Sequence, residues 1–377
     1  MNIAYFSNQF ADKDGHGIAR YSRELYRALV NLDTDLAINP VAAWSGLPEA
    51  DLKKLSDETS LKLLPWGRRV TPLSWSWFDW PPIERWLDGQ VDVVHALSLG
   101  YAIATDKPFV VTVHDIGPLT HPEFFTYKGE KIMKQSLKQA VKRADALICV
   151  SRSTAAELSE YVGGQIADKI HVVHEGVAAV FNEPINSGCL ADLPGLPEQG
   201  TPYILATGKI SPRKNVARIV KALDRLSDRI PHHLVLVGGD GWKMNELLGE
   251  LKHSDIAARV HMIGYATDEQ LKALYAGASA YAHPSLYEGF GLTVLESMAV
   301  GCPVITSNVY SLPEVAGEAA LLVDPLCIDK IAEAIEAVCT DQGFADELVK
   351  KGRAQVEKFS WAACAEGVAG VYKGIAK

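Results

Sequence analysis

Two glutamates on either side of a glycine turn are the residues of this chain best suited to chemistry. Glu288 and Glu296 are separated by seven residues, and Gly289-Phe290-Gly291 follows Glu288 directly. An apolar run before the turn (278–282) predicts a strand, and the apolar run after it predicts a helix. A strand, a glycine turn and a helix start direct unpaired backbone N–H groups and the positive end of a helix dipole at one point. That point suits a diphosphate.

The spacing of the two carboxylates predicts one extended ligand. Glu288 precedes the expected helix and Glu296 lies about two turns inside it, at about 1.5 Å rise per residue. One carboxylate could bind a ribose and the other a sugar, while the glycines between them bind phosphates. A ligand with these three parts is a sugar nucleotide. The alternative is a packing turn in an ordinary α/β domain, in which Glu288 caps the helix.

This pattern resembles the signature of the retaining, nucleotide-sugar-dependent glycosyltransferases of the GT-B fold, glycosyltransferase family four. The resemblance covers nearly the whole chain. The loop Gly15-His16-Gly17 and the following Ile-Ala-Arg-Tyr are similar to the glycine loop near the start of these enzymes. The resemblance implies that the backbone of Gly17 approaches the donor phosphate across the cleft between domains. A simple tight turn is the alternative.

A histidine ends one of the expected strands of the first half. The β-branched run 109–113 is typical of a buried parallel strand and leads into His114. Ligands bind at the carboxyl ends of such strands, although a lone histidine there is often structural. The resemblance implies that His114 contacts the donor sugar near the reacting carbon. No role is assigned to Glu175, which follows a later strand.

A positive cluster follows the first strand of the second half. Lys209, Arg213 and Lys214 lie between the strand 203–208 and a helix that begins near Val216. Such a cluster suits a diphosphate, although a solvated basic turn has the same composition. The resemblance implies that Lys214 binds the donor phosphates. It leaves open whether Lys209 or Arg213 makes the second contact.

The resemblance thus implies a complete set of site residues. His114, Glu288 and Lys214 are expected to be catalytic. The expected donor-binding residues are Gly17, Lys209, Arg213, Lys214, Ile263, Glu288, Gly289, Phe290, Gly291, Leu292, Thr293 and Glu296. Ile263 is expected to flank the nucleotide base. No metal ligands are expected, because no Asp-x-Asp motif stands out and the cations can stabilise the leaving diphosphate.

Composition limits the class of protein. The length of 377 residues predicts two domains, and the net charge of −9 argues against polyanion binding as the main role. Six cysteines without a C-x-x-C pair are expected to be reduced thiols of a cytosolic protein. We expect no signal peptide and no transmembrane helix, and therefore a cytoplasmic protein or one bound to the inner face of the plasma membrane.

Tryptophan is concentrated in one segment. Five of the eight tryptophans lie within 66–86, beside Arg68 and Arg69. Aromatic and basic residues together can contact a membrane interface or a lipid-linked acceptor. The alternative is that these rings cover the core of the N-terminal domain or form a helical hairpin.

Alternating strands and helices on both sides of a proline- and glycine-rich segment define the expected architecture. We expect an α/β protein of the GT-B type, with two doubly wound Rossmann-like domains facing a cleft. The N-terminal, acceptor-side domain covers 1–180, 181–200 is a linker, and the donor domain covers 201–358. The final helix (about 359–377) is expected to cross back to the N-terminal domain.

The resemblance implies transfer of a hexose with retained configuration to a hydroxyl of a glycan or polyprenyl-diphosphate-linked acceptor. Likeness to mannosyltransferases of bacterial O-antigen and exopolysaccharide assembly favours GDP-mannose as the donor. A UDP-sugar-dependent enzyme of the same family is the main alternative. An NAD-dependent oxidoreductase, a sugar-nucleotide epimerase and a non-enzymatic assembly protein remain as further alternatives. No nucleic-acid partner is expected.

Overall fold

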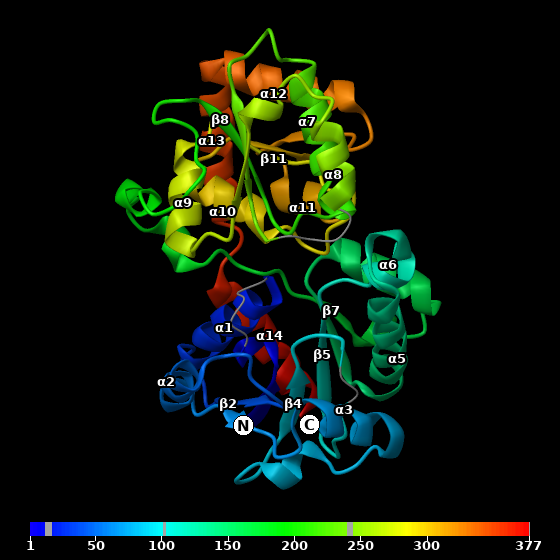
Figure 1. Ribbon diagram of the computed structural model, residues 1–377. Helices are drawn as coiled ribbons and strands as arrows, with labels where there is room; N and C mark the ends of the chain where they lie inside the picture. The colour runs from blue at the N-terminus through cyan, green and yellow to red at the C-terminus, as the bar shows by residue number, and fades with distance from the viewer. Residues whose placement is uncertain (12–16, 101–102, 240–243, 377) are drawn as a thin grey trace. The chain divides into compact units, whose positions relative to one another are not determined.

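The structure is a computed structural model that describes residues 1–11, 17–100, 103–239 and 244–376. The chain forms two compact units, shown in Figure 1. The first combines Met1–Gly176 with Ser360–Lys377, and the second is Val177–Phe359. Each unit is described by itself.

The first unit is built on a parallel sheet. Within the described residues it has seven strands in the order β3-β2-β1-β4-β5-β6-β7, so the strand order reverses between β1 and β4. Nearly every residue of β4, β5 and β6 is buried, which explains their apolar, β-branched sequences. The strands are β1 (Asn2–Phe6), β2 (Ala37–Ala42), β3 (Lys62–Leu63), β4 (Val93–Ala96), β5 (Phe109–Val113), β6 (Ala146–Cys149) and β7 (Ile170–Val172).

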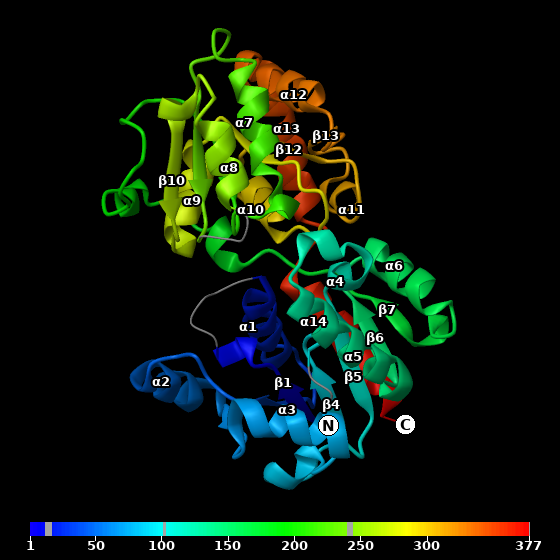
Figure 2. The ribbon, with the colours of Figure 1, turned by 45° about the vertical axis from the view of Figure 1, so that its right-hand side comes forward.

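Helices pack around this sheet (Figure 2). They are α1 (Gly17–Val30), α2 (Glu49–Thr59), α3 (Gly67–Phe78), α4 (Gly117–Thr120), α5 (Tyr127–Arg143), α6 (Arg152–Val162) and α14 (Trp361–Ile375). The last helix packs against α1, which confirms that the end of the chain returns to the first unit. Its Tyr372 hydroxyl lies 2.6 Å from Nδ1 of His95, a buried residue of β4.

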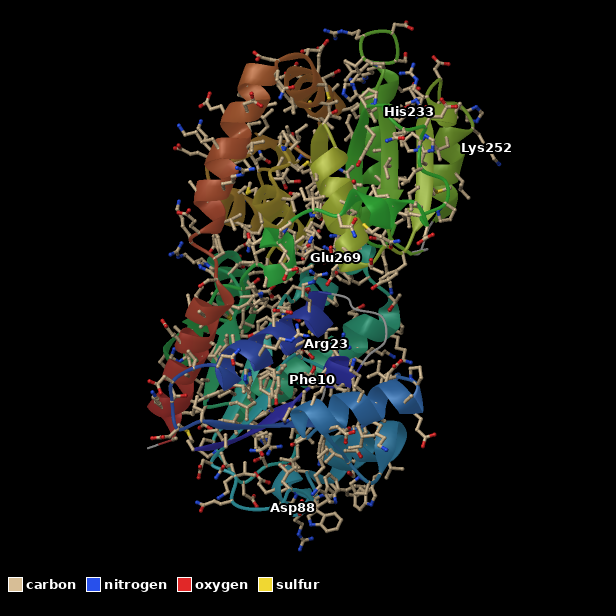
Figure 3. The ribbon with its side chains drawn as sticks, turned by 90° about the vertical axis from the view of Figure 1, so that its left-hand side faces the viewer. Phe10, Arg23, Asp88, His233, Lys252 and Glu269 are labelled. Carbon is tan, nitrogen blue, oxygen red and sulfur yellow. The ribbon has the colours of Figure 1, made fainter. Side chains whose placement is uncertain are left out.

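The segment before α1 is tied to that helix. Residues Gln9–Ala11 form a 3-10 helix, and Nε of Arg23 in α1 donates to the carbonyl of Phe10 at 3.1 Å (Figure 3). The loop from Asp12 to His16, on which the expectation for Gly15 falls, lies outside the described residues. Gly17 is the first residue of α1.

The second unit contains another parallel sheet. Its six strands, counted within the described residues, follow the order β10-β9-β8-β11-β12-β13. This is the doubly wound Rossmann order, with the reversal between β8 and β11. The strands are β8 (Tyr203–Thr207), β9 (His233–Val237), β10 (Val260–Gly264), β11 (Ala280–His283), β12 (Val304–Ser307) and β13 (Leu321–Val323).

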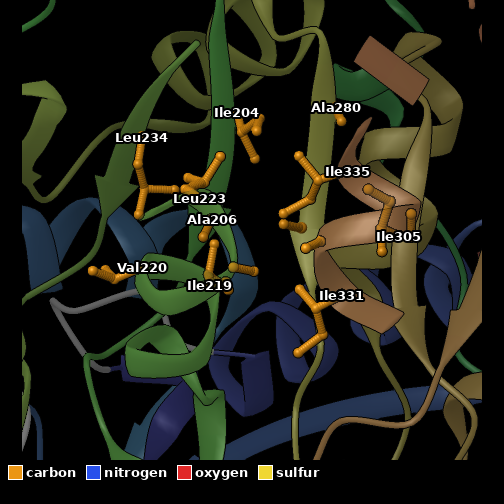
Figure 4. Packing of buried hydrophobic residues seen from close by; sticks show 14 of the residues in the cluster. Ile204, Ala206, Ile219, Val220, Leu223, Leu234, Ala280, Ile305, Ile331 and Ile335 are labelled. Carbon is orange, nitrogen blue, oxygen red and sulfur yellow. The ribbon is translucent and has the colours of Figure 1, made fainter. Parts of the chain in front are cut away.

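Helices on this sheet bury a continuous apolar core, part of which is shown in Figure 4. Ile219 and Leu223 of α7 and Ile331 and Ile335 of α12 pack on strand residues such as Ile204. The helices are α7 (Val216–Asp224), α8 (Met244–Leu251), α9 (Asp268–Gly277), α10 (Leu292–Val300), α11 (Leu312–Ala316), α12 (Ile328–Thr340) and α13 (Gln342–Val356).

The segment 181–200 belongs to the second unit, although its composition predicts a linker. Two 3-10 helices in this part of the chain (Ala179–Asn182 and Ser187–Leu190) pack against α9. Phe181 and Leu193 are buried, and Nε2 of Gln270 donates to the carbonyl of Cys189 at 3.3 Å. Prolines and glycines turn the chain here, but its apolar side chains anchor it.

Two helices begin at residues that are typical helix caps. Ser151 caps α6 through the amide of Thr154, and Thr267 and Gln270 form a capping box at α9. Along the described ranges, none of the helices combines the length and the apolar character needed to cross a bilayer.

The return of α14 predicts a strict requirement for glycine at position 176. A Cβ on Gly176 would lie 2.2 Å from the backbone nitrogen of Trp361 and 2.5 Å from the carbonyl carbon of Ser360. Backbone atoms cannot move aside as flexible side chains do, so we expect Gly176→Ala to destabilise the protein by about 3 kcal/mol. Gly370→Ala is the matched control, because a Cβ there meets open space and alanine favours the helix. Equal melting temperatures for the two variants would contradict this prediction.

Candidate active site

The reversal of strand order in the second unit brings two loops together. One loop follows β8 and carries Lys209, Arg213 and Lys214, and the other follows β11 and carries Glu288. Ligands of open α/β sheets bind outside the carboxyl ends of strands at this kind of switch point. Gly208 makes room there, since its φ is +110° and a Cβ would lie 3.0 Å from Cε of Lys214.

Glu288 is the centre of a charged cluster. Its Oε1 accepts from Nζ of Lys214 at 2.7 Å, and its Oε2 lies 2.5 Å from Nη1 of Arg213. Nε2 of His283 lies 3.2 Å from Oε1. The side chains of Glu288 and Lys214 are only 11% and 13% exposed. The predicted phosphate-binding lysine and the predicted sugar-binding carboxylate are therefore direct partners.

The electrostatics of the cluster follow from burial and charge. Burial by itself raises the pKa of Glu288, but Arg213, Lys214 and the hydrogen bond from His283 together bring it well below its ordinary range. Burial lowers the pKa of Lys214, whereas Glu288 and Glu296 favour its charged form. Burial and the charge of Lys214 lower the pKa of His283 to about 4. Two cations beside one carboxylate leave a net positive charge for an anionic ligand.

Asn215 fixes the two loops to each other. Its backbone is left-handed (φ +60°), a conformation that asparagine tolerates, and its buried Nδ2 donates to the carbonyls of Pro284 and Pro325 at 2.8 and 2.7 Å. Nη1 of Arg213 also donates to the carbonyl of Tyr287 at 2.8 Å. The positions of the cations thus depend on contacts across three strand ends.

Sequence reasoning missed His283, Asn215 and Ser311 as site residues. Ser311 Oγ lies 2.8 Å from the carbonyl oxygen of Glu288 and 2.7 Å from that of Phe290, so its hydroxyl holds the glycine turn. The strand-end position of His283 and the asparagine after Arg-Lys were available as signals. Nothing in the local sequence marks Ser311.

The glycine turn leads into α10 as predicted. Gly291 has φ +118°, and a Cβ would lie 2.9 Å from Cδ2 of Leu312. The backbone amides of Gly291, Leu292 and Thr293 therefore come at the helix start, where N–H groups lack intrahelical acceptors. The Phe290 ring is buried and packs edge-on against Phe359 at 5.9 Å. Its contribution to a ligand site is limited to its backbone.

The remaining predicted residues of this unit lie in three different settings. Gly289 is part of the turn and half-buried, and Glu296 is buried on α10 at a distance from which its charge affects Lys214. Lys209 is exposed and makes no ion pair within the described part of the chain. The Ile263 side chain is buried in β10 and faces Gly195, so it is covered by the segment expected to be a linker.

His114 and Gly17 belong to the first unit. His114 follows β5, and its Nε2 lies 2.9 Å from the carbonyl oxygen of Leu97, the residue after β4. Its Nδ1 lies 3.2 Å from Oε1 of the buried Glu175, and the ring of Tyr21 packs edge-on against it at 4.7 Å. Gly17, at the start of α1, has open space where a Cβ would be.

Both ring nitrogens of His114 have polar partners. A carbonyl oxygen only accepts, so Nε2 of His114 must donate to Leu97. Nδ1 then lies against Oε1 of Glu175. This identifies Glu175, to which the sequence assigned no role, as the partner that orients the strand-end histidine.

The geometry of the second unit can bind a dianion and orient what is attached to it. Lys214 and Arg213 provide the charge, the start of α10 provides backbone donors, and Glu288 provides a hydrogen-bond acceptor. Among the residues with described positions, no three His, Cys, Asp or Glu side chains gather as metal ligands do.

Both halves of the chain match families of glycosyltransferases. The family described as Glycosyltransferase Family 4 matches residues 15–179, and the family described as Glycosyl transferases group 1 matches residues 194–355. The chain belongs to the GT-B glycosyltransferases that combine these two domains, which confirms the family and the fold expected from Glu288, Glu296 and the glycine turn. This family assignment replaces the alternative that the chain is an NAD-dependent oxidoreductase.

The relatives include mannosyltransferases. The O-antigen chain mannosyltransferase B of Escherichia coli is 32% identical over 266 residues, which cover 70% of this chain and 70% of that protein. The serotype-specific mannosyltransferase WbdA of Escherichia coli is also 32% identical, over 67% of this chain but only 32% of its own length. A glycogen synthase of Mycobacterium tuberculosis is 28% identical over 74% of this chain and 68% of its own.

Solved structures share the fold along nearly the whole chain. Sucrose-phosphate synthase from Thermosynechococcus elongatus has a TM-score of 0.74 at 20% identity and covers 99% of this chain and 98% of its own. HepE from Anabaena, solved with UDP-glucose, has a TM-score of 0.74 at 18% identity, with coverage of 99% and 100%.

The buried His283 predicts a specific acid sensitivity. Its pKa is lowered to about 4 in the folded chain, so between pH 6.5 and 4 only the unfolded chain binds this proton. The contribution of this residue to stability should therefore fall as the pH drops from 6.5 to 4, by about 3 kcal/mol in total. Urea unfolding of the full chain across this range measures the slope.

The variant His283→Gln should flatten this pH dependence, whatever its stability at pH 7. The control is His253→Gln, which removes one exposed imidazole from the same unit. If His283→Gln and the wild type lost stability in parallel between pH 6.5 and 4, the assignment of a buried neutral ring would be wrong.

Proposed function

We propose that this chain transfers mannose from GDP-mannose to a hydroxyl group, with retention of configuration, during the assembly of a bacterial surface polysaccharide. The observation that carries the proposal is the pairing of Lys214 and Arg213 with Glu288 at the switch point of the second sheet. At this point two cations that can bind a diphosphate form ion pairs with a carboxylate that can accept hydrogen bonds from sugar hydroxyls.

The first demand of the reaction is to stabilise the leaving diphosphate. In this proposal Lys214 and Arg213 bind its oxygens, with the backbone amides of Gly17 and of Phe290 to Thr293 as further donors. Their charge is present before the reaction, so the developing negative charge needs no rearrangement of solvent. The proposed reaction therefore needs no metal ion. Lys209 remains an alternative second cation, because it is exposed and adjacent.

The second demand is to hold the sugar while its ring becomes oxocarbenium-like. Glu288 accepts from the sugar hydroxyls after the phosphates take over its two cations, and Glu296 serves the ribose. His114, oriented by Glu175, acts near the anomeric carbon. No carboxylate is assigned as a covalent nucleophile. The acceptor hydroxyl attacks from the side of the leaving group, and a leaving phosphate oxygen takes its proton.

The choice of mannose rests on the Escherichia coli mannosyltransferases that this chain resembles. The alternative is a UDP-sugar donor in the same site. HepE, which was solved with UDP-glucose, shares the fold at 18% identity, and this likeness assigns no donor to the present chain. One hydroxyl or one base contact decides between these donors.

The proposed acceptor is a glycan or an oligosaccharide linked to polyprenyl diphosphate. The support is the O-antigen assignment of the relative that covers 70% of this chain. Such an acceptor places the enzyme in the cytoplasm, at or near the inner face of the plasma membrane.

The ion pairs predict opposite effects of two substitutions on nucleotide binding. Glu288→Gln removes the group that competes for Lys214 and Arg213, so we expect unchanged or tighter binding of GDP with at least about 100-fold slower transfer. Lys214→Gln should weaken GDP binding about tenfold or more and also abolish transfer. Calorimetric titration and a radiolabelled transfer assay measure the two effects.

The control is Lys252→Gln, which removes an exposed charge elsewhere in the second unit. Near-normal transfer by Glu288→Gln, or unchanged GDP binding by Lys214→Gln, would contradict the proposed site.

A panel of nucleotides separates the donors. At 100 times its dissociation constant a ligand stabilises the folded protein by about 2.7 kcal/mol, which a thermal-shift assay detects. We expect GDP and GDP-mannose to raise the melting temperature equally with and without magnesium. If UDP species alone stabilised the protein, the family assignment would stand but GDP-mannose would be wrong as the donor. A requirement for magnesium would contradict the metal-free mechanism.

A further inference from the structure

An exposed apolar surface lies on α3 and the residues that follow it. Trp77 and Phe78 are each 77% exposed, and Val70, Leu73 and Trp80 are also exposed. Val70, Leu73 and Trp77 follow one another at three- and four-residue spacing and therefore share one face of the helix. Large apolar side chains gathered in this way mark an interaction site. We call these five residues the aromatic surface.

The aromatic surface stands on a rigid base. Trp75, on the other side of α3, is only 1% exposed, and its Nε1 donates to the carbonyl of Pro81 at 2.8 Å. Its ring packs against Trp86 at 5.9 Å and against Phe6 of β1 at 5.7 Å. The tryptophans of this segment thus have two roles. Trp75 is part of the core, and Trp77 is free to contact a partner.

A basic stripe runs along helix α5 of the same unit. Lys128, Lys131, Lys134, Lys138 and Lys142 are all exposed. At about 100° per residue they occupy about a third of the helix circumference, opposite the buried side. The helix contains six basic residues and a single acidic residue, Glu130, in a chain of net charge −9. The stripe is therefore a local exception to the charge of the protein.

One ion pair connects the end of α3 with the end of α5. Asp79, the residue after Phe78, forms an ion pair with Arg143, the residue after Lys142. Nη2 of Arg143 also donates to the carbonyl of Thr105 at 3.1 Å, so this junction is fixed to the loop between β4 and β5. α3 and α5 are both part of the first unit (Figure 2).

We infer that α3 and α5 together form a docking surface for an anionic lipid bilayer. Tryptophan and phenylalanine insert at the level of the headgroups, and lysines near an anionic surface each strengthen binding about fivefold. Without such a local stripe, a chain of charge −9 would be repelled by an anionic membrane.

The exposed aliphatic residues favour a bilayer over a nucleic acid as the occupant. Val70 and Leu73 gain from contact with acyl chains and offer no ring on which a base can stack. The inference does not depend on the transfer reaction, because it concerns the first unit alone and is measured by binding.

Cosedimentation with vesicles tests the inference. We expect the full-length chain to pellet with phosphatidylcholine vesicles that contain phosphatidylglycerol, and far less with phosphatidylcholine alone. The additional binding that is due to phosphatidylglycerol should weaken as salt is raised, because exposed charges are screened over about 8 Å at physiological ionic strength. Equal binding to both vesicles, or no binding, would overturn the inference.

Two sets of variants separate the two halves of the surface. The triple variant Lys131→Gln, Lys134→Gln, Lys138→Gln should weaken binding about 100-fold. The double variant Trp77→Ala, Phe78→Ala should weaken binding at least about tenfold and also reduce it on neutral vesicles. Both sets remove only exposed side chains, so the melting temperature should stay within about 2 °C of the wild type.

Matched controls remove the same groups elsewhere. The first is Lys252→Gln, Lys330→Gln, Lys350→Gln, which deletes three exposed charges of the second unit. The second is Ile185→Ala, Leu326→Ala, which deletes two exposed apolar side chains. Controls that lose binding as strongly as the test variants would overturn the inference. Retention of RNA by the basic stripe without vesicle binding would assign the surface to a nucleic acid and overturn it too.

Discussion

The buried carboxylate of Glu288 is the constraint on which the second unit depends. A buried charge is stable only beside partners, so the loops after β8 and β11 must hold their ends within hydrogen-bond distance of each other. The hydrogen bonds of Asn215 and Ser311 keep them there. The ligand-free site is thus preorganised, and its two cations are already paired with Glu288. In the proposed reaction a diphosphate binds Lys214 and Arg213, which are already in position. Glu288 then becomes available to accept hydrogen bonds from the sugar.

The sequence predicted the fold well because the signals for it are local. Apolar runs such as those of β5 and β9 define parallel strands, and serine and threonine mark the starts of α6 and α9. Lys214 and Glu288 were found through their neighbours in the chain. Their direct contact across 74 positions was not predicted, because it depends on the order of strands in the sheet.

The site residues that sequence reasoning missed also depend on contacts between distant parts of the chain. Asn215 bonds to residues 69 and 110 positions away, and Ser311 to residues more than 20 positions away, so no local pattern reveals either. The prolines and glycines of 181–200 correctly indicate turns. They do not reveal that Phe181 packs its ring against Tyr275 at 6.2 Å, which makes this segment part of a unit. Ile263 is covered for the same reason.

The hydrogen bond between His95 and Tyr372 joins residues 277 positions apart, and the second unit is inserted between them as one continuous stretch. During synthesis, therefore, the second unit emerges from the ribosome whole while the first still lacks α14. Domains generally fold as they appear, so the inserted unit can reach its native state first. Until α14 has been made, the face of α1 that receives it is uncovered, so the nascent first unit exposes apolar surface for longer than the second.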